Sequence, residues 1–290
     1  MIKHLSHSAL QLYRQDKRAF YIRYCAGAKR DYDQTRPAVA GLAFDVLVKS
    51  DLTGAPADLS QIQPEHMEWG KTAGAHLLEV YKSSGAYDDL AELVNRADEV
   101  LAEDKVYGTV AGVPFTGVVD LAARVDGVWF VIDFKVRGYC GRHNTSPTPG
   151  YLRMRNGETL DKQHARAVPG ELRGYRISHA PIETFSSKWA DQLFIYGELL
   201  KVTTPTIYGI DELVGNGSGG GVPRVRVAQH RGQISDQHRR NLWREIQSAW
   251  GDGHRGLGFT DAERDHFDRV AKFDENDPAF SNLSSMPFWG

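Results

Sequence analysis

One predicted β-hairpin constrains the fold more strongly than any other feature of this sequence. The runs Val113–Val125 and Val128–Val136 are rich in β-branched and aromatic residues, and Asp126-Gly127 separates them. An Asp-Gly pair between two such runs is the strongest short-range signal for a hairpin closed by a two-residue turn. We therefore predict that these two runs pair as antiparallel strands.

The register of this hairpin brings charged side chains together. If Val125 faces Val128, counting outward places Asp120 opposite Asp133. Side chains alternate between the two faces of a strand, so Lys135 shares the face of Asp133. Like charges that face each other across a strand pair are destabilising at their separation of about 4.5–5.5 Å. The paired carboxylates therefore require a stabilising partner.

A divalent cation is one such partner. Oxygen ligands of this kind suit Mg²⁺ or Mn²⁺, which keep coordination positions open for water and phosphate. Carboxylates, a metal ion and a lysine that holds or polarises a water together suit phosphodiester hydrolysis. The alternative is that Asp133 and Lys135 form only a partly exposed ion pair on an edge strand.

The rest of the chain predicts an α+β fold. Helical patterns cover a stretch that begins at Ser6 or Ser8 and ends near Cys25, then Ala38–Leu52, Glu65–Lys82, Asp88–Ala102, Ser187–Lys201 and Ser235–Trp250. Further strands are predicted at Lys105–Ala111, Pro205–Val214 and Val222–His230. We expect a central mixed sheet flanked by helices. Residues 1–104 would form an N-terminal helical region that wraps the core, 105–255 the core itself, and 256–290 a polar C-terminal tail.

The core contains an irregular basic insertion at residues 137–181. Its three acidic residues are outnumbered by eight basic ones, which are Arg137, Arg142, Arg153, Arg155, Lys162, Arg166, Arg173 and Arg176. Lysine and arginine side chains bind nucleic-acid backbones by neutralising phosphates. The insertion is therefore either a nucleic-acid-binding segment beside the site or a solvated surface loop.

Composition and motifs exclude several classes. Lys and Arg number 35 against 37 Asp and Glu, so a globally basic coat is excluded. Cys25 and Cys140 are too few for a four-cysteine iron–sulfur cluster. Gly70-Lys71-Thr72 lacks the first glycine of a nucleotide-binding P-loop, because Glu65 stands there. No apolar run is long enough to span a membrane, and no secretory leader is visible, so we expect a cytoplasmic protein.

The motif Gly117…Asp120, followed by Asp133-Phe134-Lys135, resembles the core of the PD-(D/E)xK nuclease superfamily. Further motifs resemble its RecB-type branch and occur in the same order: Leu5–Leu10 followed by Phe20-Tyr21, then Gly41…Asp45, and Gln192…Tyr196. Glutamine and tyrosine four residues apart share one helical face. The absence of cluster cysteines and the chain length are similar to phage-type recombination exonucleases.

This resemblance implies roles for individual residues. Asp120, Asp133 and the Phe134 carbonyl would bind Mg²⁺ or Mn²⁺, and Lys135 would be the catalytic lysine. Gln192 and Tyr196 would position the DNA or the lysine. Asp45 stands where many relatives carry a metal-binding histidine, so it is either a metal ligand or a solvated helix residue.

The sequence therefore predicts a metal-dependent DNA nuclease of RecB type, with exonuclease-like character. The alternatives are a catalytically silent relative that binds nucleic acid or a protein partner, and an RNA-directed nuclease that uses the same residues. The C-terminal tail, which ends in Pro287-Phe288-Trp289, either docks onto a protein partner or onto the body of the chain.

Overall fold

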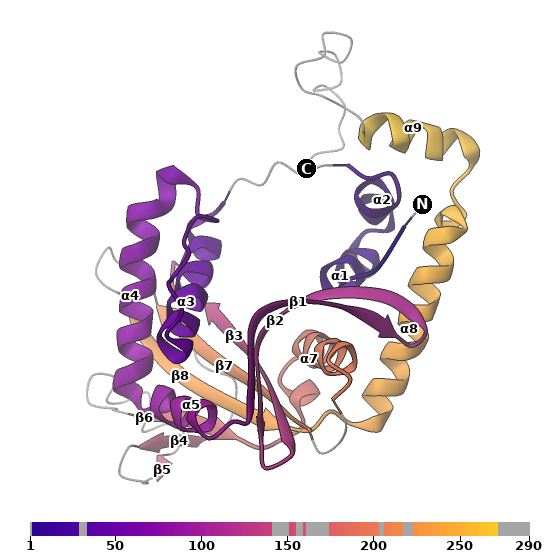
Figure 1. Cartoon of the computed structure of the whole chain (residues 1–290). Coiled ribbons are helices and arrows are strands. Elements are labelled where there is room, and N and C mark those ends of the chain that lie inside the picture. Colours follow the sequence, from indigo (N-terminus) through magenta and orange to yellow (C-terminus); the bar gives the residue numbers. More distant parts are fainter. Residues whose placement is uncertain are drawn as a thin grey trace. The chain divides into compact units, whose positions relative to one another are not determined.

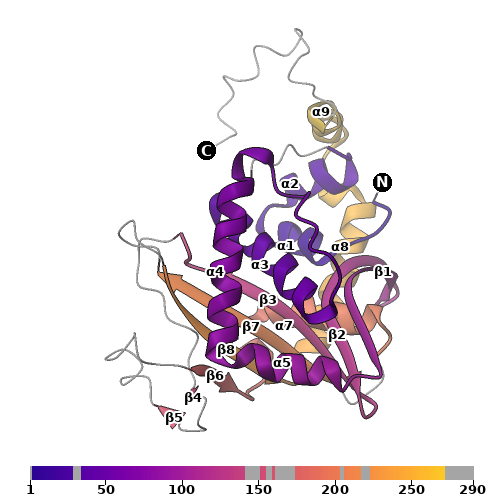
Figure 2. The same ribbon diagram turned by 60° about the vertical axis from the view of Figure 1, so that its left-hand side comes forward.

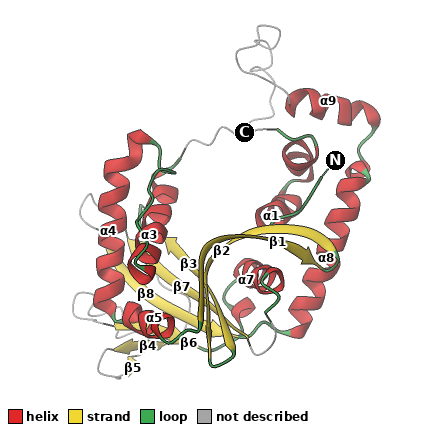
Figure 3. Ribbon diagram, in the orientation of Figure 1, coloured by secondary structure: helices red, strands yellow, loops and turns green. Residues whose placement is uncertain are grey.

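The structure is a computed structural model that describes residues 2–28, 34–140, 151–154, 159–160, 174–202, 206–216 and 223–271. It consists of two compact units. The first unit comprises Met1–Tyr32, Thr109–Phe115 and Leu242–Gly290, and the second comprises Asp33–Gly108 and Thr116–Asn241. Helices and strands are both abundant (Figure 3), so the predicted α+β class is confirmed.

A mixed sheet of eight strands lies at the centre of the second unit. Its spatial order is β1-β2-β3-β7-β8-β6-β4-β5. The strands are β1 (Glu99–Val110), β2 (Val113–Val125), β3 (Val128–Arg137), β4 (Tyr151–Met154), β5 (Thr159–Leu160), β6 (Gly174–Ser178), β7 (Thr206–Asn216) and β8 (Arg224–Gly232). Strands β3 and β7 are parallel, whereas β2 and β3 are antiparallel, as are β7 and β8.

The hairpin β2–β3 has the register that the sequence predicts. Val125 pairs with Val128 and Leu121 pairs with Ile132. Asp126 and Gly127 have φ angles of 51° and 76°. Positive φ at both central residues is the signature of a type I′ turn, whose twist matches that of the two strands.

Helices cover both faces of this sheet (Figures 1 and 2). Three of them pack on one face: α3 (Arg36–Thr53), α4 (Met67–Ser84) and α5 (Ala86–Asn95). On the other face lies α7 (Ser187–Leu199), which packs against β3 and β7. The middle of β3, from Val131 to Phe134, is therefore buried on both faces, which explains why apolar residues there are not confined to alternate positions.

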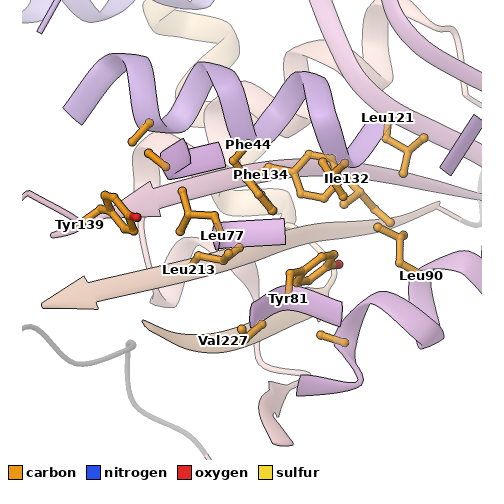
Figure 4. Packing of buried hydrophobic residues seen from close by; sticks show 14 residues of the cluster. Phe44, Leu77, Tyr81, Leu90, Leu121, Ile132, Phe134, Tyr139, Leu213 and Val227 are labelled. Atoms are coloured by element: carbon orange, nitrogen blue, oxygen red, sulfur yellow. The ribbon is translucent and has the colours of Figure 1, made fainter. Parts of the chain in front are cut away.

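The main core lies between the sheet and helices α3 to α5. Phe44, Tyr81 and Phe134 meet there in edge-to-face contacts, with the ring centroids of Phe44 and Phe134 5.9 Å apart. Ile132 and Leu213 complete the sheet side of this cluster (Figure 4). Phe134 thus points away from the face that carries Asp133, as the alternation of the strand predicts.

Two predictions of local structure need correction. The predicted helix Asp88–Ala102 is wrong beyond Asn95, because α5 ends there and β1 begins at Glu99. Val100 and Ala102 both pack against the main core, and this spacing of two residues is that of a strand. The insertion at 137–181 is also less irregular than predicted, since it contributes β4, β5 and β6 to one edge of the sheet.

The first unit contains the N-terminal helices. One continuous helix was predicted to run to Cys25, but α1 (His7–Gln15) is followed by the separate α2 (Lys17–Phe20) and a π-helical turn (Tyr21–Cys25). Asp16 causes the break: its backbone is extended, and its side chain accepts hydrogen bonds from the N–H groups of Arg18 and Ala19. An aspartate in this position starts a new helix.

Aromatic rings and polar bonds hold this unit together. The ring of Tyr21 lies 5.9 Å from Phe259 and 5.8 Å from Phe267, the latter on α9 (Asp261–Ala271). Tyr13 Oη donates a hydrogen bond of 2.6 Å to Asp252 Oδ2, on the part of α8 (Asp236–His254) that belongs to this unit. Helix α9 thus lies within the predicted polar tail, while the Pro287-Phe288-Trp289 end lies outside the described residues.

None of the helices in the described part of the chain is both long and apolar enough to cross a membrane.

Candidate active site

The two hairpin aspartates meet in the second unit. Asp133 is completely buried, and its carboxyl group is close enough to that of Asp120 for a hydrogen bond between them. Asp120 Oδ2 also accepts a hydrogen bond of 3.4 Å from the backbone N–H of Phe134. The hairpin register thus brings these two acids together, as the sequence predicts.

Gln192, on α7, connects the remaining predicted residues. Its side-chain oxygen accepts a hydrogen bond of 3.1 Å from Lys135 Nζ. Its Nε2 donates to Asp133 Oδ1 at 2.8 Å and to Tyr196 Oη at 2.9 Å. Lys135 also forms an ion pair with Asp133. Both amide hydrogens are therefore used and the oxygen accepts one bond, so the side chain fixes the lysine and the aspartate relative to each other.

Gly117 allows α7 to approach β2 closely enough for this network. A Cβ atom at this position would lie 2.9 Å from Cε1 of Tyr196 and 3.3 Å from Cδ1 of Leu199. Real Cβ atoms essentially never show a contact below 3.0 Å. The glycine of the Gly117…Asp120 motif therefore has a steric role, because it leaves room for the tyrosine ring.

Lys49 is a member of this cluster that sequence reasoning missed. Its Nζ lies 2.5 Å from Asp45 Oδ2, one helical turn earlier on α3, and 3.6 Å from Asp120 Oδ1. Its side chain is only 5% exposed. Asp45 thus reaches the hairpin aspartates through a lysine. The available signal was the i, i+4 spacing of Asp45 and Lys49, which places both on one helical face.

The electrostatics of the cluster differ for its two central acids. Burial raises the pKa of Asp133 well above its usual range, and the neighbouring Asp120 carboxylate raises it further. Burial acts in the same direction on Asp120, but its hydrogen bond with Asp133 and the ammonium groups of Lys49 and Lys135 bring its pKa below the usual value. Two carboxyl groups that share one buried site typically separate in this way.

The pKa of Lys135 is raised. Burial lowers the pKa of this ammonium, but the charges of Asp133 and Asp120 outweigh that effect. Burial also raises the pKa of the Tyr196 hydroxyl, and the two aspartates add to this. The lysine is therefore held in its charged form, and the tyrosine in its neutral form.

The donor set fits a divalent cation. The carboxylates of Asp120 and the fully buried Asp133 lie side by side, and Lys135, which contacts Asp133 Oδ2, compensates only part of their negative charge. No three His, Cys, Asp or Glu side chains within the described ranges converge on one point as a metal-binding group. Protein carboxylates would therefore supply two ligands, and a backbone carbonyl, water and phosphate oxygens the others, which suits Mg²⁺-like ions.

A second polar cluster continues across the same face of the sheet. Glu212 pairs with Lys135 in the parallel ladder, is fully buried and forms an ion pair with Arg137. His230 Nε2 lies 3.1 Å from Glu212 Oε2, and the guanidinium of Arg137 lies 5.7 Å from the ring of Trp189. Sequence reasoning missed Glu212 and His230, because neither belongs to a recognised motif and their burial depends on the order of the strands in the sheet.

Arg137 is thus the basic residue of the insertion whose surroundings the structure shows. Five other predicted nucleic-acid-binding residues lie outside the described residues: Arg142, Arg155, Lys162, Arg166 and Arg173. Arg153 and Arg176 lie on β4 and β6, whose backbones alone are described. Their role in binding stays a prediction.

Comparison with known proteins identifies the family of the site. Residues 4–147 match the model of the PD-(D/E)XK nuclease superfamily. The matched segment includes Asp45, Asp120, Asp133 and Lys135 and ends before α7. The chain therefore carries a PD-(D/E)XK nuclease superfamily domain, and this part of the prediction is confirmed. A nuclease-type function follows at this level, and members of the superfamily generally use divalent metals.

A structural comparison found similarity to a crystal structure from Eubacterium rectale described as "Putative exonuclease". It covers 91% of this chain and 82% of that chain, with 12% sequence identity and a TM-score of 0.46. None of the curated proteins matches the sequence significantly.

Proposed function

We propose that the protein is a metal-dependent deoxyribonuclease of RecB type that hydrolyses phosphodiester bonds with exonuclease-like character. The observation that carries this proposal is the network of Asp120, Asp133, Lys135 and Gln192 within one buried cluster. An exposed ion pair on an edge strand, the alternative from the sequence, does not explain a fully buried Asp133.

Asp120, Asp133 and the Phe134 carbonyl would hold Mg²⁺ or Mn²⁺. A bound ion of this kind lowers the pKa of a coordinated water and offsets charge on the scissile phosphate. Lys135, in its charged form, donates hydrogen bonds to the attacking water or to the phosphoryl oxygen that gains negative charge. Gln192 fixes the direction of the ammonium because its oxygen accepts one of the three Nζ hydrogens.

Arg137 extends the site toward the nucleic acid. It lies two residues beyond Lys135 on the same face, and its side chain is 48% exposed. Its contacts with Glu212 and Trp189 reduce the rotamers it can adopt, so less entropy is lost when it binds a phosphate. We propose that it contacts a phosphate next to the scissile one, and that the other basic residues of the insertion follow the DNA backbone.

The test is a cleavage panel. End-labelled linear duplex, closed circular plasmid, single-stranded DNA and RNA are each incubated with Mg²⁺, Mn²⁺ or EDTA, with Asp133→Ala as the matched variant. We expect metal-dependent degradation of linear DNA by the wild type and none by the variant. Nicking of the plasmid would identify an endonuclease, and preferential RNA cleavage would refute the DNA substrate. No cleavage of any substrate, with metal still bound, would identify a silent binding module.

A further inference from the structure

We propose that the ammonium group of Lys49 occupies the position of a second cation in this site, so that the protein binds one divalent ion and not two. This inference rests on the proposed function, because it concerns the metal that Asp120 and Asp133 would hold. It assigns a role to a residue that lies in no recognised motif of the sequence.

The first observation is the position of the ammonium. Lys49 Nζ lies between two carboxylates, 2.5 Å from Asp45 Oδ2 and 3.6 Å from Asp120 Oδ1. A cation that bridged Asp45 and Asp120 would have to occupy the same place. The side chain of Lys49 is 5% exposed, so the ammonium cannot move into solvent without a rearrangement of the surrounding side chains.

The second observation is the length and direction of the side chain. Asp45 and Lys49 are one turn apart on α3, and this turn of the helix faces the hairpin. Lysine carries a compact charge on a four-carbon stem, and here the stem is buried while the head reaches the carboxylates. The helix therefore delivers a covalently attached positive charge to Asp120 that is present whether or not a metal is bound.

The third observation is the balance of formal charge. In their ionised forms Asp45, Asp120 and Asp133 supply three negative charges, and Lys49 and Lys135, which form ion pairs with them, supply two positive ones. One divalent ion therefore leaves the site weakly positive, which favours an anionic phosphate. A second divalent ion would add two further positive charges to a largely buried site, where uncompensated charge is costly.

The position of Asp45 follows from this arrangement. Its Oδ2 is paired with Lys49, and this contact holds the ammonium against Asp120, so we infer that Asp45 acts on the metal site through the lysine. This makes Asp45 and Lys49 positioning residues.

The experiment counts bound ions. The full chain, without nucleic acid, is titrated with Mn²⁺ in a calorimeter, and the same titration is made on Lys49→Met and Lys49→Arg. Methionine keeps most of the buried stem and removes the charge, whereas arginine keeps the charge. We expect one ion in the wild type, one in Lys49→Arg and two in Lys49→Met. The second ion should disappear again in the double variant Lys49→Met/Asp45→Asn.

Two ions in the wild type would overturn the inference, and so would a single ion in a folded Lys49→Met. If Lys49→Met does not fold, Asp45→Asn decides the question. A positioning role predicts that its Mn²⁺ affinity falls by at most about 10–100-fold, the range for groups that orient a metal site, whereas complete loss of Mn²⁺ binding would identify Asp45 as a ligand and overturn the inference.

The failure of this inference is distinguishable from the failure of the proposed function. Asp133→Ala should lose the ion that the wild type binds. If the wild type binds no Mn²⁺, or if Asp133→Ala binds it unchanged, the metal site at Asp120 and Asp133 is refuted. If binding of that ion depends on Asp133 but Lys49→Met still binds only one ion, the nuclease proposal stands and the proposed role of Lys49 is refuted.

Discussion

Replacing Asp133 by asparagine should make the metal-free protein more stable while it abolishes metal binding. Asp133 is completely buried, and its carboxylate lies beside that of Asp120. Burial of the charge, together with this neighbour, raises its pKa. Above this raised pKa the folded protein carries an unfavourable negative charge that asparagine would not have, although the two side chains have nearly the same shape.

The magnitude follows from three contributions. Unit charges about 5 Å apart interact by about 3 kcal/mol at an effective dielectric constant of about 20. The repulsion from Asp120 opposes the attraction to Lys135, whose ammonium contacts the carboxylate directly, and we take the two to cancel. Burial of the carboxylate remains and costs several kcal/mol. The hydrogen bond from Gln192 offsets about 1.5–3 kcal/mol of that cost while its acceptor is charged. We expect a net gain of about 2 kcal/mol for Asp133→Asn.

The assay is thermal unfolding in EDTA over a series of increasing pH values, and on the high-pH side of the raised pKa a gain of this size raises the melting temperature by about 5 °C. The advantage should shrink as the pH falls through the raised pKa, because native Asp133 then binds a proton that the unfolded chain does not bind. Mn²⁺ should raise the melting temperature of the wild type only. An Asp133→Asn protein that melts at or below the wild type in EDTA would refute the electrostatic reasoning.

Three further predictions concern other parts of the chain. Gly117→Ala should lower the free energy of unfolding by about 1–3 kcal/mol, because the new Cβ overlaps the Tyr196 ring. The cleavage rate should also fall in protein that is still folded. Denaturant unfolding measures the first effect and single-turnover kinetics the second, and wild-type values in both would show that the ring has room for the Cβ. Glu212→Gln should weaken DNA binding several-fold in a fluorescence titration without changing Mn²⁺ affinity, because Arg137 loses the ion pair that holds its side chain in place. An unchanged DNA affinity would show that Arg137 does not contribute to DNA binding. Burial raises the pKa of the Cys25 thiol to about 11. Its alkylation rate, measured by mass spectrometry, should therefore be about a hundredfold lower at pH 8 than that of an unperturbed thiol, and the rate should rise with pH. Rapid alkylation at pH 8 would contradict this burial.

The hairpin and its acidic pair were predictable because local chemistry determines them. Asp126-Gly127 adopts the two positive φ angles of a type I′ turn, and once the turn is known the pairing of Leu121 with Ile132 follows by counting. The same alternation places Phe134 in the core. Gln192 and Tyr196 were predictable as a pair on one helical face, and their contact with the hairpin depended on the family resemblance.

The residues that α3 and β7 contribute to the site could not be predicted from the local sequence. Lys49 reaches Asp120 only because α3 packs on the sheet beside the hairpin, and this packing is a tertiary property. Glu212 is buried because β7 lies between β3 and β8, which follows from the sheet order and not from the local pattern. The strand Glu99–Val110 was partly misassigned to a helix for a similar reason, because its apolar residues are packed by neighbours far away in the chain.

The central claim is that Lys135 performs chemistry at a metal held by other residues. The most direct test measures cleavage of a linear duplex by Lys135→Ala in Mn²⁺, with the Mn²⁺-induced rise in melting temperature recorded on the same protein. We predict that the thermal shift persists and that the cleavage rate falls by about two to three orders of magnitude, the range for loss of one hydrogen-bond donor that stabilises developing negative charge. An unchanged cleavage rate in a folded, metal-binding Lys135→Ala protein would contradict the account.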